Sequence, residues 1–399
     1  MVRNRASAIL WMSFAYLLAG VNLINPLLPT IRTGLGVSTG DVATLYSIYL
    51  IALVPLLLLL PRARYGASPR TQLLIAVGLM AGADVLHGAG HPGALGIGRV
   101  LLAGSVALGT SSVAELAVLT AGQRGRTVTA TANTAGALAG TLIGGAGLLL
   151  STSPVRVVFL GHALAALVLV AVILRGVPDV GAGGVGRTVR PVEAARPVEA
   201  ARPVGATRPV AAARSGGRLD GAVLGGFAFA AAATVIVLAP SLFEQAHSAL
   251  GDRVQLVPIA MYVAAALAQS RARASRRSIQ AWGLVTLAGL GLMLSSVLVG
   301  GVSLLVLGAA VTGAGFGAVF MLGLAWTTYG VADSAQGPLA SSYACIAYAT
   351  AAAVAIGGGY LADAAGAPSA LVLILLAASG ALLAWVIRTR SSLVPFVPS

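Results

Sequence analysis

The feature of this sequence that most limits its fold is a series of apolar blocks, each about 20 residues long, separated by short polar breaks. A helix of about 20 residues crosses a hydrocarbon core of about 30 Å. Charged residues make up only 9% of the chain, whereas an ordinary globular domain carries roughly 25%. The alternating pattern of a membrane β-barrel is not found, and Ala, Leu, Val and Gly dominate the blocks. The sequence therefore predicts an all-α membrane protein.

The order of the blocks predicts two bundles of six transmembrane helices. Six blocks precede a long polar stretch and six follow it, which divides the chain into a bundle at 1–175, a linker at 176–219 and a bundle at 220–399. The predicted spans are 7–28, 41–60, 71–89, 93–115, 127–150, 155–175, 220–240, 254–270, 279–299, 302–326, 335–361 and 368–387.

The placement of arginine supports this count. All 25 basic residues are arginine, and with a cytoplasmic N-terminus 21 of them fall on the inner side, 3 on the outer side, and Arg99 within a span. This is the positive-inside distribution of a protein with both termini in the cytoplasm, and it predicts a multi-pass protein of the plasma membrane. The net charge of +14 is thereby explained by the lipid bilayer as a partner, without nucleic acid.

The linker carries a six-residue repeat that begins with Arg190-Pro-Val-Glu-Ala-Ala and returns at Arg196, Arg202 and Arg208. A proline in every sixth position prevents a continuous helix, and so few large apolar groups cannot build a core. We expect a disordered cytoplasmic tether whose arginines can contact anionic lipid headgroups.

The fifth predicted span contains Gly136-Ala-Leu-Ala-Gly140-Thr141-Leu-Ile-Gly144-Gly145. Glycines four residues apart share one smooth helix face, against which another helix can pack closely. Generic small-residue packing explains this pattern equally well. The stretch also resembles the antiporter motif G-x-x-x-G-P-x-x-G-G in the fifth helix of the major facilitator superfamily, with Thr141 in the place of proline.

Two further stretches resemble the same family, so that the resemblance covers essentially the whole chain. After the second span, Arg64 and Gly66 resemble a remnant of the family signature G-x-L-a-D-R-x-G-R-R, with Ala63 where the signature has aspartate. Arg99, with Gly104 nearby, resembles the arginine motif of the fourth span. The resemblance implies a twelve-span fold of the drug and metabolite:proton antiporter branch.

Few ionisable residues lie inside the predicted spans, and each costs about 2.5–3.5 kcal/mol on insertion scales. Asp84 and Arg99 are expected either to pair across the hairpin of the third and fourth spans, or to reach the outer interface separately. Glu115 is the strongest single candidate for a residue that binds the coupling proton; alternatively it is solvated near the cytoplasmic end of its helix. The proton-coupling candidates are therefore Glu115, Asp84 and Arg99.

Neutral polar and aromatic side chains in the first and later spans are candidates for a substrate cavity, although helix packing or anchoring at the interface is an alternative role for each aromatic residue. These candidates are Tyr16, Asn22, Asn25, Phe316, Trp326, Tyr343 and Tyr348.

The sequence excludes several other kinds of chemistry. A chain without lysine cannot contain the phosphate-binding motif of an ATP-driven pump, and we find no motif of an enzyme, no metal-binding cluster and no sign of a cofactor. We expect a secondary active transporter, functional as a monomer, that exports small apolar molecules such as drugs or secondary metabolites in exchange for protons. An uptake symporter for a small metabolite and a non-transporting sensor or scaffold remain alternatives.

Overall fold

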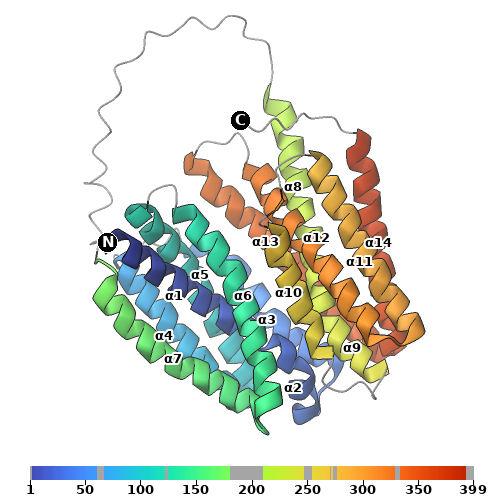
Figure 1. Ribbon diagram of the computed structural model, residues 1–399, viewed down its shortest axis with the longest axis horizontal. Coiled ribbons are helices and arrows are strands. Elements are labelled where there is room, and N and C mark those ends of the chain that lie inside the picture. Colours follow the sequence, from blue (N-terminus) through green and yellow to red (C-terminus); the bar gives the residue numbers. More distant parts are fainter. Residues whose placement is uncertain are drawn as a thin grey trace, which may run out of the picture.

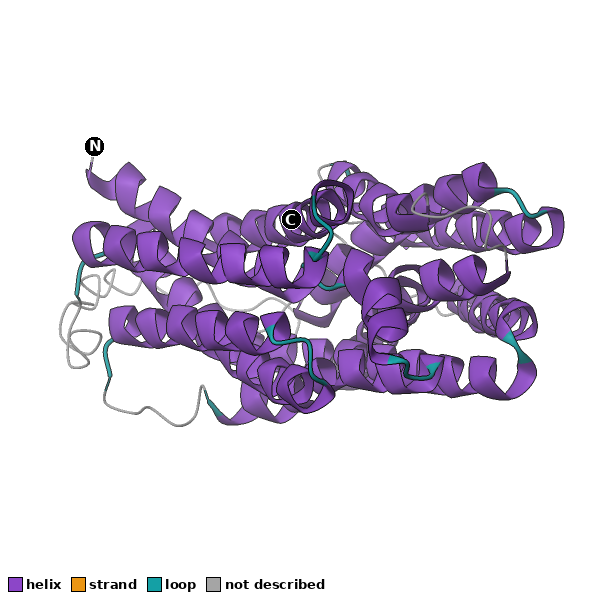
Figure 2. Ribbon diagram, turned by 90° about the horizontal axis from the view of Figure 1, so that it is seen from below, coloured by secondary structure: helices purple, strands orange, loops and turns teal. Residues whose placement is uncertain are grey.

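The computed structural model describes residues 2–60, 67–121, 125–179, 210–246, 254–269, 271–272, 276–328 and 333–391. Within these ranges the chain is helical and has no strand (Figure 2). The helices of the first half are α1 (Val2–Asn22), η1 (Asn25–Leu27), α2 (Leu28–Leu35), α3 (Thr39–Leu59), α4 (Pro69–Gly88), α5 (Pro92–Ala121), α6 (Gly125–Leu150) and α7 (Pro154–Gly176). Those of the second half are α8 (Val210–Ala233), η3 (Thr234–Leu238), α9 (Ala239–Ala246), α10 (Leu256–Gln269), α11 (Arg276–Val299), α12 (Val302–Thr328), α13 (Asp333–Ala365) and α14 (Ala367–Ser391).

The helices confirm the prediction of an all-α membrane fold. In the described residues, 11 segments are long and apolar enough to span a membrane, and the shorter apolar helix α10 corresponds to the eighth predicted span. Large apolar side chains on one face of α7 are exposed, among them Leu164, Leu167 and Val168. These positions share a face of the helix, and an exposed apolar stripe of this kind is suited to lipid.

The first and seventh spans are both broken near a proline. Pro26 lies in the short 3-10 helix η1, which separates α1 from α2. Pro240 follows η3, a π-helical turn between α8 and α9. Proline has no N–H to donate, and its ring clashes with the preceding helical turn, so a locally tighter or wider turn accommodates it.

The helices form two groups (Figure 1): α1–α7 lie on one side of the molecule and α8–α14 on the other. Within the first group α1 packs on α6, and α4 packs on α5 and α7; within the second, α8 packs on α12 and α13, and α11 packs on α12 and α14. The main contacts between the groups are α3 with α13 and α6 with α10. We call these groups the N-half and the C-half.

Helix α1 begins and α14 ends at the same end of the molecule, where α7 also ends and α8 begins (Figure 1). We call this the linker end and the opposite one the far end. Arginine placement predicts that the linker end is cytoplasmic, and this assignment stays a prediction.

The linker differs from its predicted extent at one boundary. It was expected to continue to residue 219, but α8 already begins at Val210. Proline ends with Pro209 in this region, and the alanines that follow are the strongest helix formers. Residues 180–209, which hold most of the repeat, lie outside the described part of the chain.

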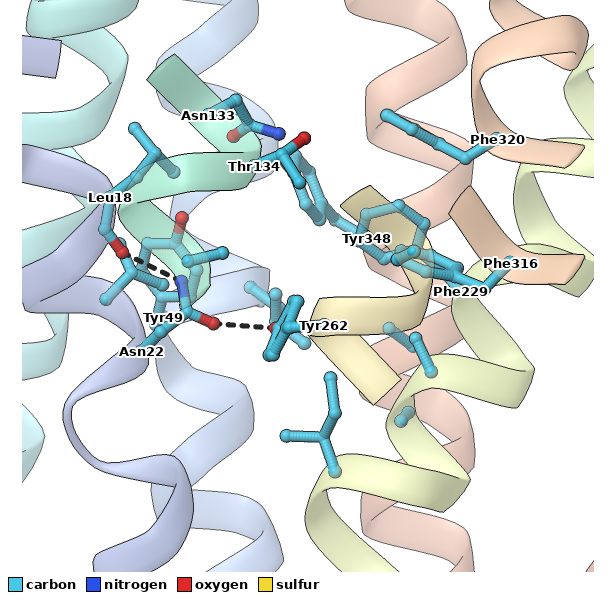
Figure 3. A pocket seen from close by; sticks show the side chains of 18 of the residues that line it. Leu18, Asn22, Tyr49, Asn133, Thr134, Phe229, Tyr262, Phe316, Phe320 and Tyr348 are labelled. Carbon is cyan, nitrogen blue, oxygen red and sulfur yellow. Dashed lines mark hydrogen bonds between the residues drawn. The ribbon is translucent and has the colours of Figure 1, made fainter. Parts of the chain in front are cut away.

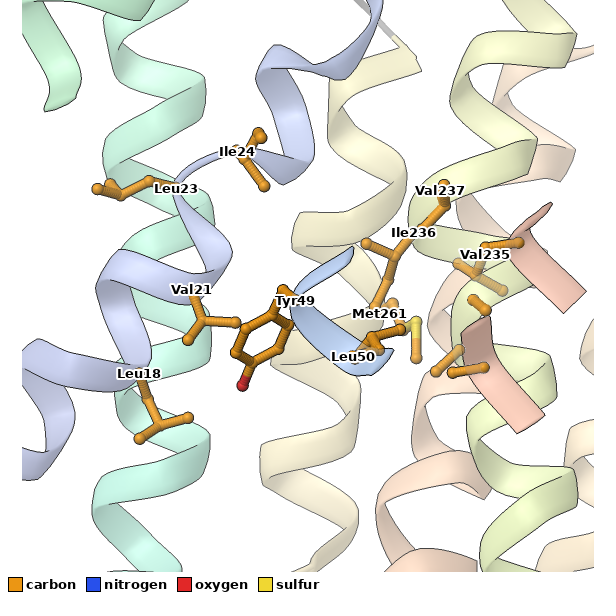
Figure 4. Packing of buried hydrophobic residues seen from close by; sticks show 14 of the residues in the cluster. Leu18, Val21, Leu23, Ile24, Tyr49, Leu50, Val235, Ile236, Val237 and Met261 are labelled. Atoms are coloured by element: carbon orange, nitrogen blue, oxygen red, sulfur yellow. The ribbon is translucent and has the colours of Figure 1, made fainter. Parts of the chain in front are cut away.

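An apolar cluster connects the two halves in the middle of the molecule (Figure 4). Tyr49 and Leu50 of α3 lie between Val21 of α1 and two C-half residues, Ile236 of η3 and Met261 of α10. The cluster places α3 beside the candidate site.

Candidate functional site

A cavity of about 100 Å³ lies between the N-half and the C-half. Helices α1, α3 and α6 line one side, and α8, α10, α12 and α13 line the other (Figure 3). The polar and aromatic residues of the lining are Asn22, Tyr46, Tyr49, Asn133, Thr134, Phe229, Tyr262, Gln269, Phe316, Phe320 and Tyr348.

Side-chain hydrogen bonds join the two halves at this cavity. The Tyr262 hydroxyl donates to Asn22 Oδ1 over 2.7 Å, which links α10 to α1 (Figure 3). Asn22 is itself fixed, because its Nδ2 donates to the carbonyl of Leu18 over 2.8 Å. Closer to the linker end, Thr134 Oγ1 donates to Gln269 Oε1 over 2.6 Å. The cavity thus has polar contacts that must break when the halves move apart.

The C-half wall of the cavity is aromatic. The ring centroid of Phe229 lies 5.5 Å from that of Phe316, 5.1 Å from that of Phe320 and 5.1 Å from that of Tyr348. Tilted and edge-to-face pairs at such distances are the favourable arrangement of aromatic rings. The rings therefore hold one another in place and form a rigid wall.

The structure places the predicted cavity residues in three different environments. Asn22, Phe316 and Tyr348 line the cavity, and Asn25 lies behind it, donating to Asn22 Oδ1 over 2.9 Å. Trp326 and Tyr16 are not among the lining residues.

Tyr343 is also outside the lining: it is 1% exposed and donates its hydroxyl to the carbonyl of Phe320 over 2.7 Å. It supports the aromatic wall from behind. Sequence reasoning missed five aromatic residues that do line the cavity, namely Tyr46, Tyr49, Phe229, Tyr262 and Phe320.

Asp84 pairs with His162, whereas the sequence suggested a pair with Arg99. Asp84 Oδ2 lies 2.7 Å from His162 Nδ1, and the two side chains are 0% and 5% exposed. The expected alternative, in which Asp84 reaches the outer interface, is excluded by this burial. The pairing joins α4 to α7, which pack side by side, and spacing along the sequence does not reveal it.

Tyr16 of α1 completes the group around His162. The Tyr16 ring stacks on the imidazole with centroids 4.1 Å apart, and its hydroxyl donates to the carbonyl of His162 over 3.0 Å. His162 Nε2 in turn lies 3.3 Å from the Tyr16 carbonyl oxygen. The group joins three helices of the N-half, α1, α4 and α7.

Arg99 is 1% exposed and faces α3. Its Nη2 donates to the carbonyl of Tyr46 over 2.9 Å, and its guanidinium carbon lies 5.0 Å and 5.2 Å from the ring centroids of Tyr46 and Tyr49. Within the described residues no carboxylate pairs with it. Arg99 therefore does not reach the outer interface either, and its charge is stabilised by aromatic rings and one carbonyl.

Glu115 is exposed on α5 and does not line the cavity. Glu115 is therefore not a residue of this cavity, and its role in proton coupling stays a prediction. The hydrophobic blocks indicate where a helix lies along the chain, but they do not show which face of α5 points inward.

The glycines of the fifth span form the close contact that their spacing predicts. A side-chain carbon at Gly136 or Gly140 would lie less than 3.0 Å from the carbonyl oxygens of Ala15 and Ala19 in α1, respectively. One at Gly144 would lie equally close to the carbonyl oxygen of Leu23, which directly follows α1. Gly145 instead approaches Ile259 of α10 across the two halves. Thr141 is buried and donates to the carbonyl of Ala137 over 2.9 Å.

The structure adds nothing to the resemblance of Arg64 and Gly66 to the family signature, and it shows no metal-binding group in the described residues. Arg64 and Gly66 lie outside the described residues, so that the remnant of the family signature stays a resemblance. Where the structure describes the chain, no group of three or more His, Cys, Asp or Glu side chains is placed to hold a metal ion.

At the far end, α13 caps α3 across the boundary between the halves. Asp363 Oδ1 accepts from the backbone N–H of Thr39 over 3.0 Å, and its Oδ2 accepts from that of Gly40 over 2.8 Å. These amides belong to the first turn of α3, where a helix has unpaired donors and a partial positive charge. The contact holds the far end of the molecule closed.

Sequence comparison and structure comparison give different results for this chain. No protein-family profile matches the sequence, and no curated protein matches it. Similar solved structures exist, and transporters are among them.

The first is the nucleoside transporter NupG (TM-score 0.68, 13% identity, 98% of this chain and 100% of that chain covered). The second is a bacterial homolog of the human lysosomal transporter Spinster in an inward-facing and occupied conformation (0.73, 11%, 100% and 99%). The third is a POT family transporter in complex with a thioalcohol-conjugated peptide (0.73, 12%, 97% and 96%). Almost the whole chain superimposes on these three transporters. The chain therefore has the fold of major facilitator superfamily transporters, which its motifs had suggested.

Proposed function

We propose that this protein is a secondary active transporter that exports small molecules through the plasma membrane in exchange for protons. The observation that carries the proposal is the buried Asp84–His162 pair in the N-half of a molecule whose cavity lies between two helical bundles. The transporters of similar fold support the general activity. Their substrates belong to those proteins and do not define the substrate of this one.

The contacts of His162 suit a group that binds and releases one proton. Both neighbours of its ring nitrogens, an Asp84 carboxylate oxygen and the Tyr16 carbonyl, accept hydrogen bonds. An ionised aspartate and a neutral histidine share a single hydrogen between these two contacts. One further proton, on either side chain, supplies a hydrogen to both. Both acceptors therefore receive a hydrogen bond only when the pair carries this further proton.

Loss of that proton would change the contacts of α1, and through α1 it would change the hydrogen bonds at the cavity. It leaves His162 with one donor for two acceptors, so that the contact with Asp84 or the contact with Tyr16 must weaken. Tyr16 and the cavity residue Asn22 are both on α1, less than two helical turns apart. A shift of α1 would change the bond between Asn22 and Tyr262, which joins the halves.

Alternating access requires that the contacts between the halves be few and reversible. At the far end the polar contacts are the bonds from Thr39 and Gly40 to Asp363 and a 3.3 Å bond from Gln245 Nε2 to Thr39 Oγ1. At the cavity they are single side-chain bonds. We propose that the halves rock about the cavity, and that the far end opens when the Asp363 cap is broken.

The export direction rests on the glycine motif of α6, which resembles that of antiporters. Uptake by proton symport would use the same cavity and the same Asp84–His162 pair. The direction in which protons move relative to the substrate distinguishes symport from exchange. We propose reconstitution of the purified chain in lipid vesicles with an imposed pH gradient in either direction and a panel of small apolar compounds. Exchange predicts that a substrate and protons move in opposite directions in wild-type vesicles and that Asp84→Asn abolishes the coupled movement. Movement in the same direction would establish symport.

A membrane sensor or scaffold is the alternative from another class, because the Arg-Pro repeat offers a segment for a partner protein. Deletion of residues 190–209, which leaves α8 whole, separates the two functions. A transporter with a tether keeps substrate-driven proton movement after the deletion, whereas a scaffold shows no such movement before or after it.

A further inference from the structure

We propose that the cavity binds an uncharged molecule with a single aromatic ring, and that Arg99 excludes cations from it. The proposal rests on the function proposed above, in that it takes this cavity as the substrate site. It defines the chemical class of the substrate, which neither the fold nor the similar structures determine.

The first reason is the absence of charge in the lining. Among the described residues that line the cavity there is no Asp, Glu, Arg or His. A charged group that enters such a space loses its hydration and can form no direct salt bridge with the lining, to which Arg99 does not belong. The amides of Asn22, Asn133 and Gln269 can instead bond to the polar edge of a neutral molecule.

The second reason is the arrangement of the rings. Phe229, Phe316, Phe320 and Tyr348 form the C-half wall, while Tyr49 lies on the opposite side (Figure 3). A flat ring placed between these walls can stack or meet them edge to face, which a saturated ring of the same size cannot do. The volume of about 100 Å³ is below the roughly 150 Å³ of an engineered cavity that holds benzene, so that the site has room for no more than one ring.

The third reason is the position of Arg99. An aromatic lining by itself also attracts cations. Here, however, the guanidinium lies 5.0 Å and 5.2 Å from the ring centroids of Tyr46 and Tyr49, two residues of the lining. The Arg99 guanidinium thus already makes the cation–π contacts that Tyr46 and Tyr49 can offer, and no carboxylate among the described residues pairs with it. Its field in a low-dielectric interior opposes a second positive charge in the cavity.

Four compounds of similar size test these reasons: nicotinamide is neutral and aromatic, 1-methylnicotinamide is a permanent cation, nicotinate is an anion, and cyclohexanecarboxamide has no aromatic ring. Binding to the purified full chain in detergent is measured by isothermal titration calorimetry. We expect nicotinamide to bind at least tenfold more tightly than each of the other three. Equal or tighter binding of the cation, of the anion or of the saturated amide would overturn the proposal, and so would no binding of nicotinamide at millimolar concentration.

Variants locate the binding to the cavity. Phe316→Leu is expected to weaken nicotinamide binding about tenfold, whereas Phe159→Leu, the same change at a buried ring outside the lining, is expected to leave it unchanged. Arg99→Gln is expected to reduce the preference for nicotinamide over 1-methylnicotinamide at least fivefold. Because Arg99 is buried, Arg99→Met is measured beside it; an unchanged preference in a folded variant overturns the role of Arg99.

Failure of this proposal and failure of the proposed function are distinguishable, because binding is measured without a membrane or a gradient. Selective binding without proton movement in vesicles would contradict proton exchange alone. Proton exchange driven by cations would contradict the substrate class alone.

Discussion

The N-half and the C-half bury different kinds of polar side chain. In the N-half four ionisable residues are buried, Asp84, His87, Arg99 and His162. In the described part of the C-half the buried polar residues are Thr, Ser and Gln, and none is ionisable. The C-half instead provides four of the rings that face the cavity, Phe229, Phe316, Phe320 and Tyr348.

This difference indicates a division of work between two bundles of similar size. A buried ionisable group is costly in a membrane and is retained where it has a function, so that under the proposed proton exchange we expect the N-half to bind the proton. The C-half provides shape and aromatic contacts. Helices α3 and α10 contribute further aromatic residues to the cavity between the halves, Tyr46 and Tyr49 from α3 and Tyr262 from α10.

The strongest test of the division removes the charge from the N-half. Asp84→Asn should lower proton-coupled transport at least 100-fold while the chain still folds, because an amide cannot take up the proton that the pair shares with His162. Transport in vesicles with a pH gradient is the measurement. Asp179→Asn, the same change at an exposed position after α7, should keep full activity. If Asp84→Asn transports normally, the N-half does not bind the coupling proton at this pair.

The next largest effect should come from the contact that holds α1 in place. Gly140→Ala puts a methyl group against the Ala19 carbonyl, and overpacking of this kind costs about 1–3 kcal/mol. The melting temperature of the purified chain should fall. Gly161→Ala on α7 is the matched control, since nothing lies within 4 Å of the added carbon, and it should be neutral. A stable Gly140→Ala variant would show that α1 and α6 can separate without loss.

A smaller effect is expected from the carboxylate with which the C-half caps α3. Asp363→Asn should increase the population open at the far end about fivefold, because it weakens two bonds to the first turn of α3. In a Cys345→Ser background, spin labels at Thr33 and Leu298 report the opening as longer distances. Asp41→Asn is the control, because Asp41 caps the same helix from within the N-half. An equal shift in both variants would mean that the cap stabilises α3 only locally.

The smallest effect should come from a C-half aromatic residue outside the cavity. Tyr343→Phe removes one hydrogen bond to the Phe320 carbonyl, which costs about 1 kcal/mol, and it should leave nicotinamide binding unchanged. The readouts are the melting temperature and calorimetric titration. A large loss of binding would place Tyr343 in the substrate site, as the sequence had suggested.

Much of the fold was predictable because it depends on short stretches of sequence. Blocks of about 20 apolar residues predict the spans, and glycines four apart predict a face of α6 against which another helix packs. The candidate site was less predictable. Tyr49, Phe229 and Tyr262 were missed, and Tyr16 and Trp326 were assigned to a cavity that they do not line.

The amino-acid sequence by itself determined that the chain forms membrane-spanning helices, and it placed the few ionisable residues within them. The partner of Asp84 and the inward face of each helix were decided only by the tertiary structure. The physical reason is that lipid and cavity are both apolar in this protein. Hydropathy therefore cannot show how a helix is rotated about its axis, and that rotation brings His162 to Asp84 and leaves Glu115 exposed.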